Sequence, residues 1–161
     1  MHLVCNWRGA DLPFDSNGIT GLSLHIEPAA RIPHATEEGC FDLIHIGHVR
    51  YLREAKSHGD VLIIGLNSDK SVSRIKPGRP VVPQDQRAEV LSALEMVDYV
   101  TFFDEDTPYE LIKLVQPDVL IKGGDWKKED IVGSDIAKET FSLPYIEGVS
   151  TSEIIEQIKK S

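Results

Sequence analysis

From residue 39 to the end of the chain, short apolar runs alternate with segments of helical periodicity. The apolar runs cover residues 61–66, 99–103 and 119–121, and each has the length of a buried strand. Strands that alternate with helices predict a parallel sheet with both faces covered. We therefore expect an α/β protein with a Rossmann-like parallel sheet and helices on both faces.

The helices between these strands are predicted from apolar stripes and from residues that start or end a helix. Val49, Leu52 and Ala55 form one stripe, and Gly59 is a suitable residue to end it. Further helices are expected over residues 83–96, 107–116 and 150–158, with a weakly helical stretch over 136–140 and an edge strand over 141–143.

The first 36 residues lack this alternation. Within them, only residues 22–26 alternate between apolar and polar positions as a strand does. We therefore divide the chain into an atypical N-terminal segment, residues 1–36, and a domain at residues 37–161.

Charge and composition exclude several classes of protein. A net charge of −9 argues against nucleic-acid binding, which needs a basic face. No apolar run approaches 18 residues, so no membrane span is expected. The N-terminus shows no signal-peptide pattern, and two cysteines do not suggest a disulfide framework. We expect a cytoplasmic protein.

The most informative motif is Gly-Cys-Phe-Asp-Leu-Ile-His-Ile-Gly-His at residues 39–48. If a helix begins near His45, then His45 and His48 lie on one face of its first turn. The free N–H groups and positive dipole at a helix N-terminus suit a phosphate, and Gly47 lets a bulky anion approach the backbone. Two imidazoles at this place suit a reaction that builds negative charge on phosphorus.

Other polar segments fall where ligands bind in such sheets. Residues 42–48, 67–69 and 122–126 are placed at the carboxyl ends of the predicted strands, and the Ser150 region is a fourth candidate. Ligands of open α/β sheets bind at this edge. The four segments therefore predict one site.

In these residues the chain resembles the nucleotidyltransferases that carry a His-x-Gly-His motif, and among them most closely the adenylyltransferases of ADP-heptose synthesis. The resemblance covers about three quarters of the chain. It is carried by residues 39–48, 67–69, 79–80, 83, 86–87, 93–95, 97–98, 105–108, 122–125 and 148–152.

The resemblance implies a fold, a reaction and partners. The fold is the nucleotidyltransferase fold. The reaction transfers AMP from ATP to a sugar 1-phosphate, heptose 1-phosphate, and releases pyrophosphate. Mg²⁺ is expected with ATP, no protein-held metal site is expected, and family members suggest a homodimer.

The resemblance also implies roles for particular residues. The catalytic residues would be His45, His48, Lys56 and Arg87. The nucleotide would contact Gly39, Cys40, Phe41, Gly47, Gly123, Gly124, Asp125, Ser150, Thr151 and Ser152. The acceptor would contact Asp42, Asn67, Lys122 and Trp126.

Simpler interpretations exist for several of these residues. Lys56 could be a solvated lysine on a helix face, and Arg87 could form a surface ion pair with Asp85 or Glu89. Asp42 could order its own loop rather than bind the acceptor.

Three further alternatives concern other parts of the site. Residues 150–153 could be only a capping box, and residues 123–125 only a tight turn. Trp126 could be ordinary packing. Residues 40–48 also hold a cysteine, an aspartate and two histidines, which could form a zinc site.

Two other functions stay open. Cytidylyltransferases acting on glycerol 3-phosphate or a similar small phosphate share the histidine motif. A nucleotide-binding protein without turnover is the third hypothesis, because Glu37 and Glu38 stand where the family has a Thr-Asn pair after its first strand. That first strand is displaced here, replaced by residues 22–26, or absent.

Overall fold

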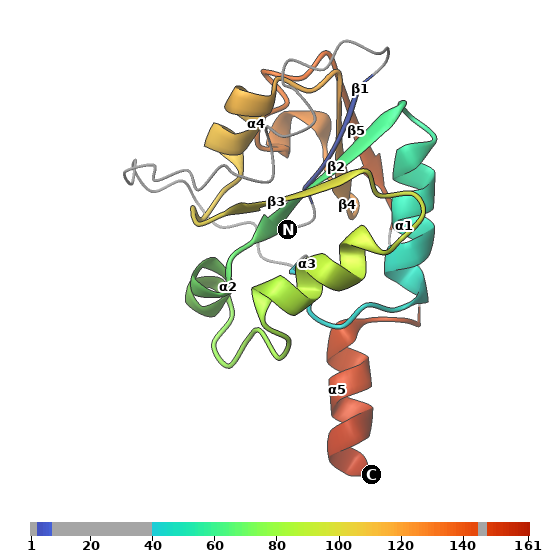
Figure 1. The fold of residues 1–161 in the computed structure, drawn as a ribbon, viewed down its shortest axis with the longest axis vertical. Coiled ribbons are helices and arrows are strands. Elements are labelled where there is room, and N and C mark those ends of the chain that lie inside the picture. The colour runs from blue at the N-terminus through green and yellow to red at the C-terminus, as the bar shows by residue number, and fades with distance from the viewer. Residues whose placement is uncertain (1–2, 8–39, 145–147) are drawn as a thin grey trace.

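The structure is a computed structural model that describes residues 3–7, 40–144 and 148–161 (Figure 1). The strand predicted at residues 22–26 and the site residue Gly39 lie outside the described residues. The strands are β1 (Leu3–Trp7), β2 (Val61–Asn67), β3 (Tyr99–Phe103), β4 (Val119–Gly123) and β5 (Glu139–Leu143). The helices are α1 (Ile46–Lys56), α2 (Asp69–Ile75), α3 (Gln84–Ser92), α4 (Tyr109–Val115), the short 3₁₀ helix η1 (Lys128–Asp130) and α5 (Thr151–Lys160).

The five strands form one mixed sheet in the order β3-β2-β1-β4-β5. β2 pairs with β3 in parallel, and β4 pairs with β5 in parallel. β1 is antiparallel to both of its neighbours, β2 and β4. The α/β class and the helices on both faces are confirmed, but the expectation of an entirely parallel sheet is wrong for the central strand.

The central strand comes from a part of the chain for which no strand was expected. Val4 and Cys5 of β1 are buried on opposite faces of the sheet, as a central strand requires. If a strand led into α1 through a short connection, that connection would fix the direction of the strand in the sheet. Here more than thirty residues separate β1 from the histidine motif, so the connection does not fix the direction of the strand.

The other four strands all run in one direction, because β2 and β4 are each antiparallel to β1. Their carboxyl ends therefore meet at one edge of the sheet. The backbone links these ends in pairs. The N–H of Ser68 donates to the carbonyl of Phe103, and that of Gly124 donates to the carbonyl of Leu143. This edge holds the polar segments that the sequence predicts to form the site.

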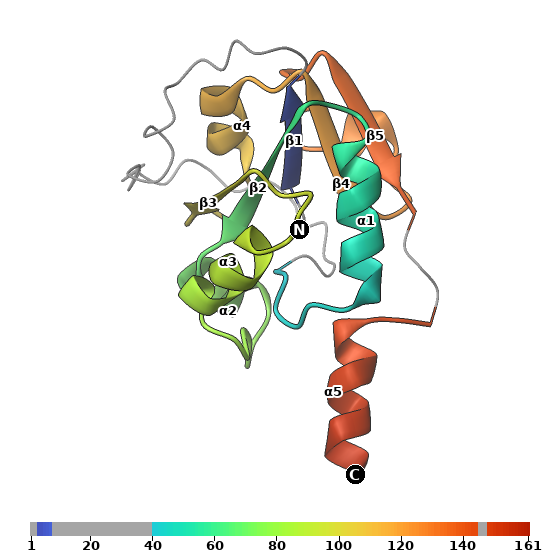
Figure 2. The same cartoon turned by 45° about the vertical axis from the view of Figure 1, so that its right-hand side comes forward.

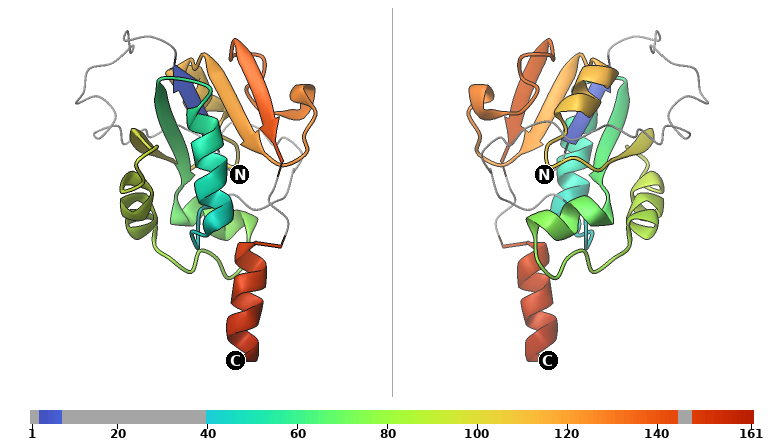
Figure 3. Two further views of the ribbon diagram at one scale, coloured as in Figure 1. Left: turned by 90° about the vertical axis from the view of Figure 1, so that its right-hand side faces the viewer. Right: turned by 90° about the vertical axis from the view of Figure 1, so that its left-hand side faces the viewer.

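Two apolar clusters cover the two faces of the sheet. The first joins Leu52 of α1 and Leu91 of α3 to Ile64 and Ile121 of the sheet. The second joins Leu111, Ile112 and Val115 of α4 to Ile63 and Leu120, among others. α1 and α4 accordingly lie on opposite sides of the sheet (Figure 3). Alternation along β4 therefore sends Ile121 toward α1 and Leu120 toward α4.

Two other segments differ from the prediction. α2 was not expected, because its seven residues bury only Ser71 and Val72 and so carry no apolar stripe. The stretch 136–140 is not a helix, since it passes through turns into β5. The predicted edge strand at 141–143 is confirmed as the second half of β5.

The last helix, α5, extends away from the body of the molecule (Figures 1 and 2). It has no buried residue, and Ile158 is exposed. Among the described residues, no helix is both long enough and apolar enough to span a membrane.

Candidate functional site

The two histidines of the motif stand at the N-terminus of α1, as predicted. His45 is the N-cap residue, with an extended backbone, and His48 lies in the first turn. The backbone N–H of His45 donates to Nδ1 of His48 at 3.3 Å. The two ring centroids are 3.9 Å apart. The start of the helix thus holds the two imidazoles side by side.

His48 is held in its neutral form. Burial, and secondarily the charge of His45, lower the pKa of His48 to about 3. Because Nδ1 accepts the hydrogen bond from His45, the ring proton of neutral His48 is on Nε2. The ring of Phe41 packs 5.2 Å from that of His48, and Phe41 takes a left-handed backbone conformation with φ of 48°. His48 is therefore a fixed hydrogen-bond donor at neutral pH.

Gly47 is required for a reason that the sequence did not reveal. A Cβ at this position would lie 3.0 Å from Cε1 and from Nδ1 of His45. That distance is shorter than ordinary van der Waals contact, so a side chain at position 47 would require the imidazole to shift by a few tenths of an ångström. The absence of a side chain lets the His45 ring lie against the first turn of α1.

The start of α5 lies beside the histidine loop. Ser150 is its N-cap residue, and its hydroxyl accepts a hydrogen bond from the N–H of Glu153, which confirms the predicted capping. The hydroxyl of Thr151 donates to the carbonyl of Leu43 at 3.3 Å. Ser152 is exposed on the same first turn. The structure thus brings residues 150–152 to the loop that leads into α1.

Asp42 orders the loop at residues 79–82. Its Oδ1 accepts from the N–H groups of Val81 at 2.7 Å and Val82 at 2.9 Å, and its Oδ2 pairs with Arg79 at 2.8 Å. The side chain is 5% exposed. The loop-ordering interpretation is therefore the one that the contacts support. Arg79 belongs to the residues that carry the family resemblance, but no site role was predicted for it.

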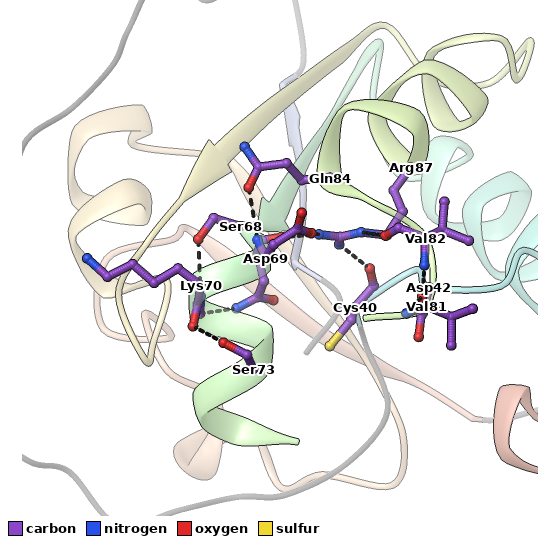
Figure 4. A network of polar contacts seen from close by, with 12 residues as sticks. Cys40, Asp42, Ser68, Asp69, Lys70, Ser73, Val81, Val82, Gln84 and Arg87 are labelled. Atoms are coloured by element: carbon purple, nitrogen blue, oxygen red, sulfur yellow. Dashed lines mark hydrogen bonds and ion pairs between the residues drawn. The ribbon is translucent and has the colours of Figure 1, made fainter. Parts of the chain in front are cut away.

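Arg87 joins four segments at the edge of the sheet (Figure 4). It is 1% exposed and donates to the carbonyls of Val82, Cys40 and Asn67 at 2.7–2.9 Å. It also pairs with Asp69 at 2.7 Å. The suggested surface ion pair with Asp85 or Glu89 is wrong. Because four of its donors are used within the protein, Arg87 holds the segments around the site in place.

Asn67 ends β2 inside the same network. Its amide nitrogen donates to the hydroxyl of Ser71 at 3.0 Å, and that hydroxyl donates to the carbonyl of Glu105. The amide oxygen of Asn67 is buried and has no hydrogen-bond partner among the described residues. It is therefore available to a donor on a ligand.

Lys122 and Trp126 form a second group, at the carboxyl end of β4. Nζ of Lys122 lies 3.2 Å from the centroid of the Trp126 ring. Between them, Gly123 and Gly124 are buried and Asp125 is exposed. Because Ile121 faces α1, Lys122 lies on the opposite face of the sheet from α1. The structure thus separates Lys122 from the face on which the histidine helix packs.

Lys56, for which the resemblance implies a phosphate contact, lies at the other end of α1 from the histidines. Lys56 is the last residue of α1, eight residues after His48, which is about 12 Å along a helix. Its Nζ donates to the carbonyl of Asp60 at 2.7 Å and pairs with Asp98 at 2.5 Å. Lys56 therefore fastens the far end of the helix to the start of β2.

The described residues contain no group of three or more histidine, cysteine, aspartate or glutamate side chains arranged to hold a metal ion. Asp42 is engaged by Arg79 and two backbone N–H groups. Cys40 is buried, and its carbonyl accepts from Arg87. The zinc alternative therefore has no support in the geometry.

Comparison with known proteins places this geometry in a family. A family model described as cytidylyltransferase-like matches residues 38–157. Three curated relatives, each named bifunctional protein HldE, are 58% identical over 122 residues in Nitratiruptor sp., 54% over 124 in Aliarcobacter butzleri and 56% over 124 in Wolinella succinogenes. The matches cover 75% or 76% of this chain and 26% of each relative, so the chain spans about a quarter of their length.

A solved structure is also similar. The crystal structure of the lipopolysaccharide core biosynthesis protein from Thermoplasma volcanium GSS1 aligns with a TM-score of 0.58 and 27% identity. The alignment covers 68% of this chain and 93% of that chain. The family match includes the paired histidines, the Arg87 network and the start of α5. As the motifs predicted, the chain belongs to the cytidylyltransferase-like family.

Proposed function

We propose that the chain is an adenylyltransferase that transfers AMP from ATP to heptose 1-phosphate, giving ADP-heptose and pyrophosphate. The observation that carries the proposal is the histidine pair at the start of α1, 3.9 Å apart and beside the start of α5. The relatives named HldE, more than half identical over most of the chain, favour this acceptor and nucleotide.

In this reaction a phosphate oxygen of the sugar 1-phosphate attacks the α-phosphorus of ATP. The bond from the α-phosphorus to the oxygen bridging to the β-phosphate breaks, and pyrophosphate leaves. The acceptor phosphate is ionised at neutral pH, so no protein base has to remove a proton. The protein has to position the reactants and stabilise the charge that builds on the transferred phosphate.

The chain offers donors for this task at the start of α1. Neutral His48 would donate from Nε2, and His45 would act beside it on the same phosphates. The N-termini of α1 and α5, with their positive helix dipoles, would also favour the phosphates, and Thr151 and Ser152 lie on the first turn of α5. Asn67 would contact a substrate donor through its buried amide oxygen.

Mg²⁺ is proposed to enter bound to the phosphates of ATP. The described residues do not form a carboxylate site for it, and Mg²⁺ commonly keeps several waters and binds through substrate phosphates. When bound, it would neutralise charge on the triphosphate and on leaving pyrophosphate. We also propose a cytoplasmic homodimer, as in the family that the motifs resemble.

A cytidylyltransferase acting on glycerol 3-phosphate is the second candidate, because the family model itself is described as cytidylyltransferase-like. Pyrophosphate release should be measured with ATP or CTP against heptose 1-phosphate and glycerol 3-phosphate, with Mg²⁺ present. Release only with ATP and heptose 1-phosphate supports the proposal. Release with CTP and glycerol 3-phosphate selects the second candidate, and no release from folded protein selects a binder without turnover.

A further inference from the structure

Lys122 is a buried cation whose ammonium is not hydrogen-bonded to an anionic oxygen of any described residue. The residue is 6% exposed, and its Nζ has no hydrogen-bond partner in the part of the chain that the structure describes. An ammonium has three N–H donors, and leaving them unpaired away from water is costly. The aromatic face of Trp126 is the group that stands over it, with the ring centroid at 3.2 Å.

The position of the Trp126 ring is fixed by backbone contacts. Its indole N–H donates to the carbonyl of Gly123 at 3.1 Å, and its backbone N–H contacts Ser142 Oγ at 2.9 Å. The hydroxyl of Ser142 also donates to the carbonyl of Gly124. Gly124 has a φ of 112°, which favours glycine and turns the chain back after β4. The turn from β4 therefore places the indole over Lys122.

The arrangement lies at the edge where ligands of such sheets bind. Lys122 is the penultimate residue of β4, and β4 neighbours the central strand. A phosphate oxygen on the ammonium makes a charge-assisted hydrogen bond, which is stronger than a cation–π contact with a half-exposed ring. Replacing the indole by a phosphate is therefore favourable once a substrate is present.

We propose that Lys122 and Trp126 form a covered phosphate-binding unit, in which the indole stands over the ammonium until a phosphate group of the substrate takes its place. Lys122 is the binding group and Trp126 its positioning residue. Ser142, which contacts the backbone on both sides of the turn, sets the resting position of the ring. The unit lies on the α4 side of the sheet, so it is separate from the donors at the start of α1. This inference rests on the proposed function for the phosphate-bearing substrate.

Two substrates of the proposed reaction carry phosphate groups. Both the nucleotide and the sugar phosphate carry the phosphate chemistry that Lys122 recognises. ATP with Mg²⁺, heptose 1-phosphate, inorganic pyrophosphate and the unphosphorylated sugar should each be titrated separately. The ligand whose binding is weakened by loss of Lys122 identifies the phosphate.

Tryptophan fluorescence reports the movement directly, because Trp126 is one of only two tryptophans. We expect a saturable fluorescence change with a phosphate-bearing ligand and none with the unphosphorylated sugar. In Trp126→Phe the change should vanish while calorimetry still detects binding, because phenylalanine keeps an aromatic ring. In Lys122→Met the Kd should rise roughly 10- to 100-fold, the range for a lost charge-assisted contact. The exposed neighbour Lys127, changed to Met, is the matched control and should bind as the wild type does.

The outcomes separate this inference from the proposed reaction. Suppose that the wild type turns over and that Lys122→Met keeps the wild-type Kd and fluorescence response. This result would overturn the inference and leave the reaction in place. A phosphate-dependent fluorescence change that depends on Lys122, without pyrophosphate release, would support the inference and contradict the reaction. If Lys122→Met does not fold, Trp126→Phe decides, since a fluorescence change that persists without Trp126 contradicts the assignment.

Discussion

Thr151 is hydrogen-bonded to Leu43, which lies 108 residues earlier in the chain. The hydroxyl of Thr151 donates to the carbonyl of Leu43 at 3.3 Å, and this contact joins the start of α5 to the loop before the paired histidines. The two helix N-termini are thereby held at one place. A site assembled from opposite ends of the domain depends on such a contact, because α5 buries no residue of its own.

Thr151→Val is expected to raise the KM for the nucleotide several-fold with little change in thermal stability. Valine has nearly the same shape but cannot donate to Leu43. Because no residue of α5 is buried, the sheet should unfold at nearly the same temperature. Steady-state kinetics and calorimetry test both points. Thr151→Ser keeps the hydroxyl and should restore the KM, and a serine variant as impaired as valine would show that the hydroxyl is not what matters.

Gly47→Ala should impair catalysis while the protein stays folded. The new Cβ would lie 3.0 Å from the His45 ring, which would have to shift by a few tenths of an ångström. Because catalysis depends on the exact position of the reacting groups, we expect kcat to fall roughly several-fold. Alanine is a better helix former than glycine, so the free energy of unfolding should not fall by more than about 0.5 kcal/mol. The kcat and a denaturant melt are the measurements. Full activity in this variant would show that the His45 ring position is unimportant.

His48 predicts a loss of stability in acid. Its folded pKa is about 3, against 6.5 as the ordinary value, so between these pH values the unfolded chain binds a proton that the folded chain does not. Stability should therefore decline as pH falls from 6.5 toward 3. The difference in melting temperature between the wild type and His48→Gln should be smaller at low pH than at pH 7, because glutamine does not titrate. If the melting temperatures of the two proteins changed equally with pH, that would contradict a buried neutral imidazole at position 48.

Arg87→Met should destabilise the fold by about 2–5 kcal/mol, because it leaves three backbone carbonyls and Asp69 without their donor. Arg74 is the matched control. It pairs with Asp106 at a site where both side chains are well exposed, so Arg74→Met should cost within about 1 kcal/mol. Urea unfolding of both variants measures the difference. Equal effects would show that the buried network contributes no more than a surface pair.

Lys56→Met should leave turnover almost unchanged. Its partners, Asp60 and Asp98, lie at the opposite end of α1 from the histidines, so the change should affect only stability, and modestly. Pyrophosphate release and a thermal melt test this. A loss of turnover of 100-fold or more, on the order expected for a missing phosphate donor, would restore the catalytic role that the resemblance implied.

Much of the fold was predictable because its signals are local. The strands at 61–66, 99–103 and 119–121 are apolar runs, and α1 and α5 have recognisable starts at His45 and Ser150. β1 was not predictable. Its five residues lie far from the motif, and they carry no signal for their place in the strand order or for the direction in which they pair with β2 and β4.

The site was predictable to the extent that its residues form a motif. The histidine pair and the start of α5 were identified in the sequence and lie together in the structure. The role of Arg87 was not visible, because three of its partners are backbone carbonyls of Cys40, Asn67 and Val82, which any residue type could supply. Ser142 gave no signal for the same reason, since it acts on the backbone of the turn after β4.

Pyrophosphate release by the wild type and by His45→Ala, with ATP, heptose 1-phosphate and Mg²⁺, tests the role of the histidine pair most directly. Circular dichroism and a thermal melt should first establish that both proteins are folded. If the pair stabilises the transferred phosphate, the wild type releases pyrophosphate and the variant is slower by roughly 100- to 1,000-fold or more. Turnover by His45→Ala at the wild-type rate would contradict the assignment.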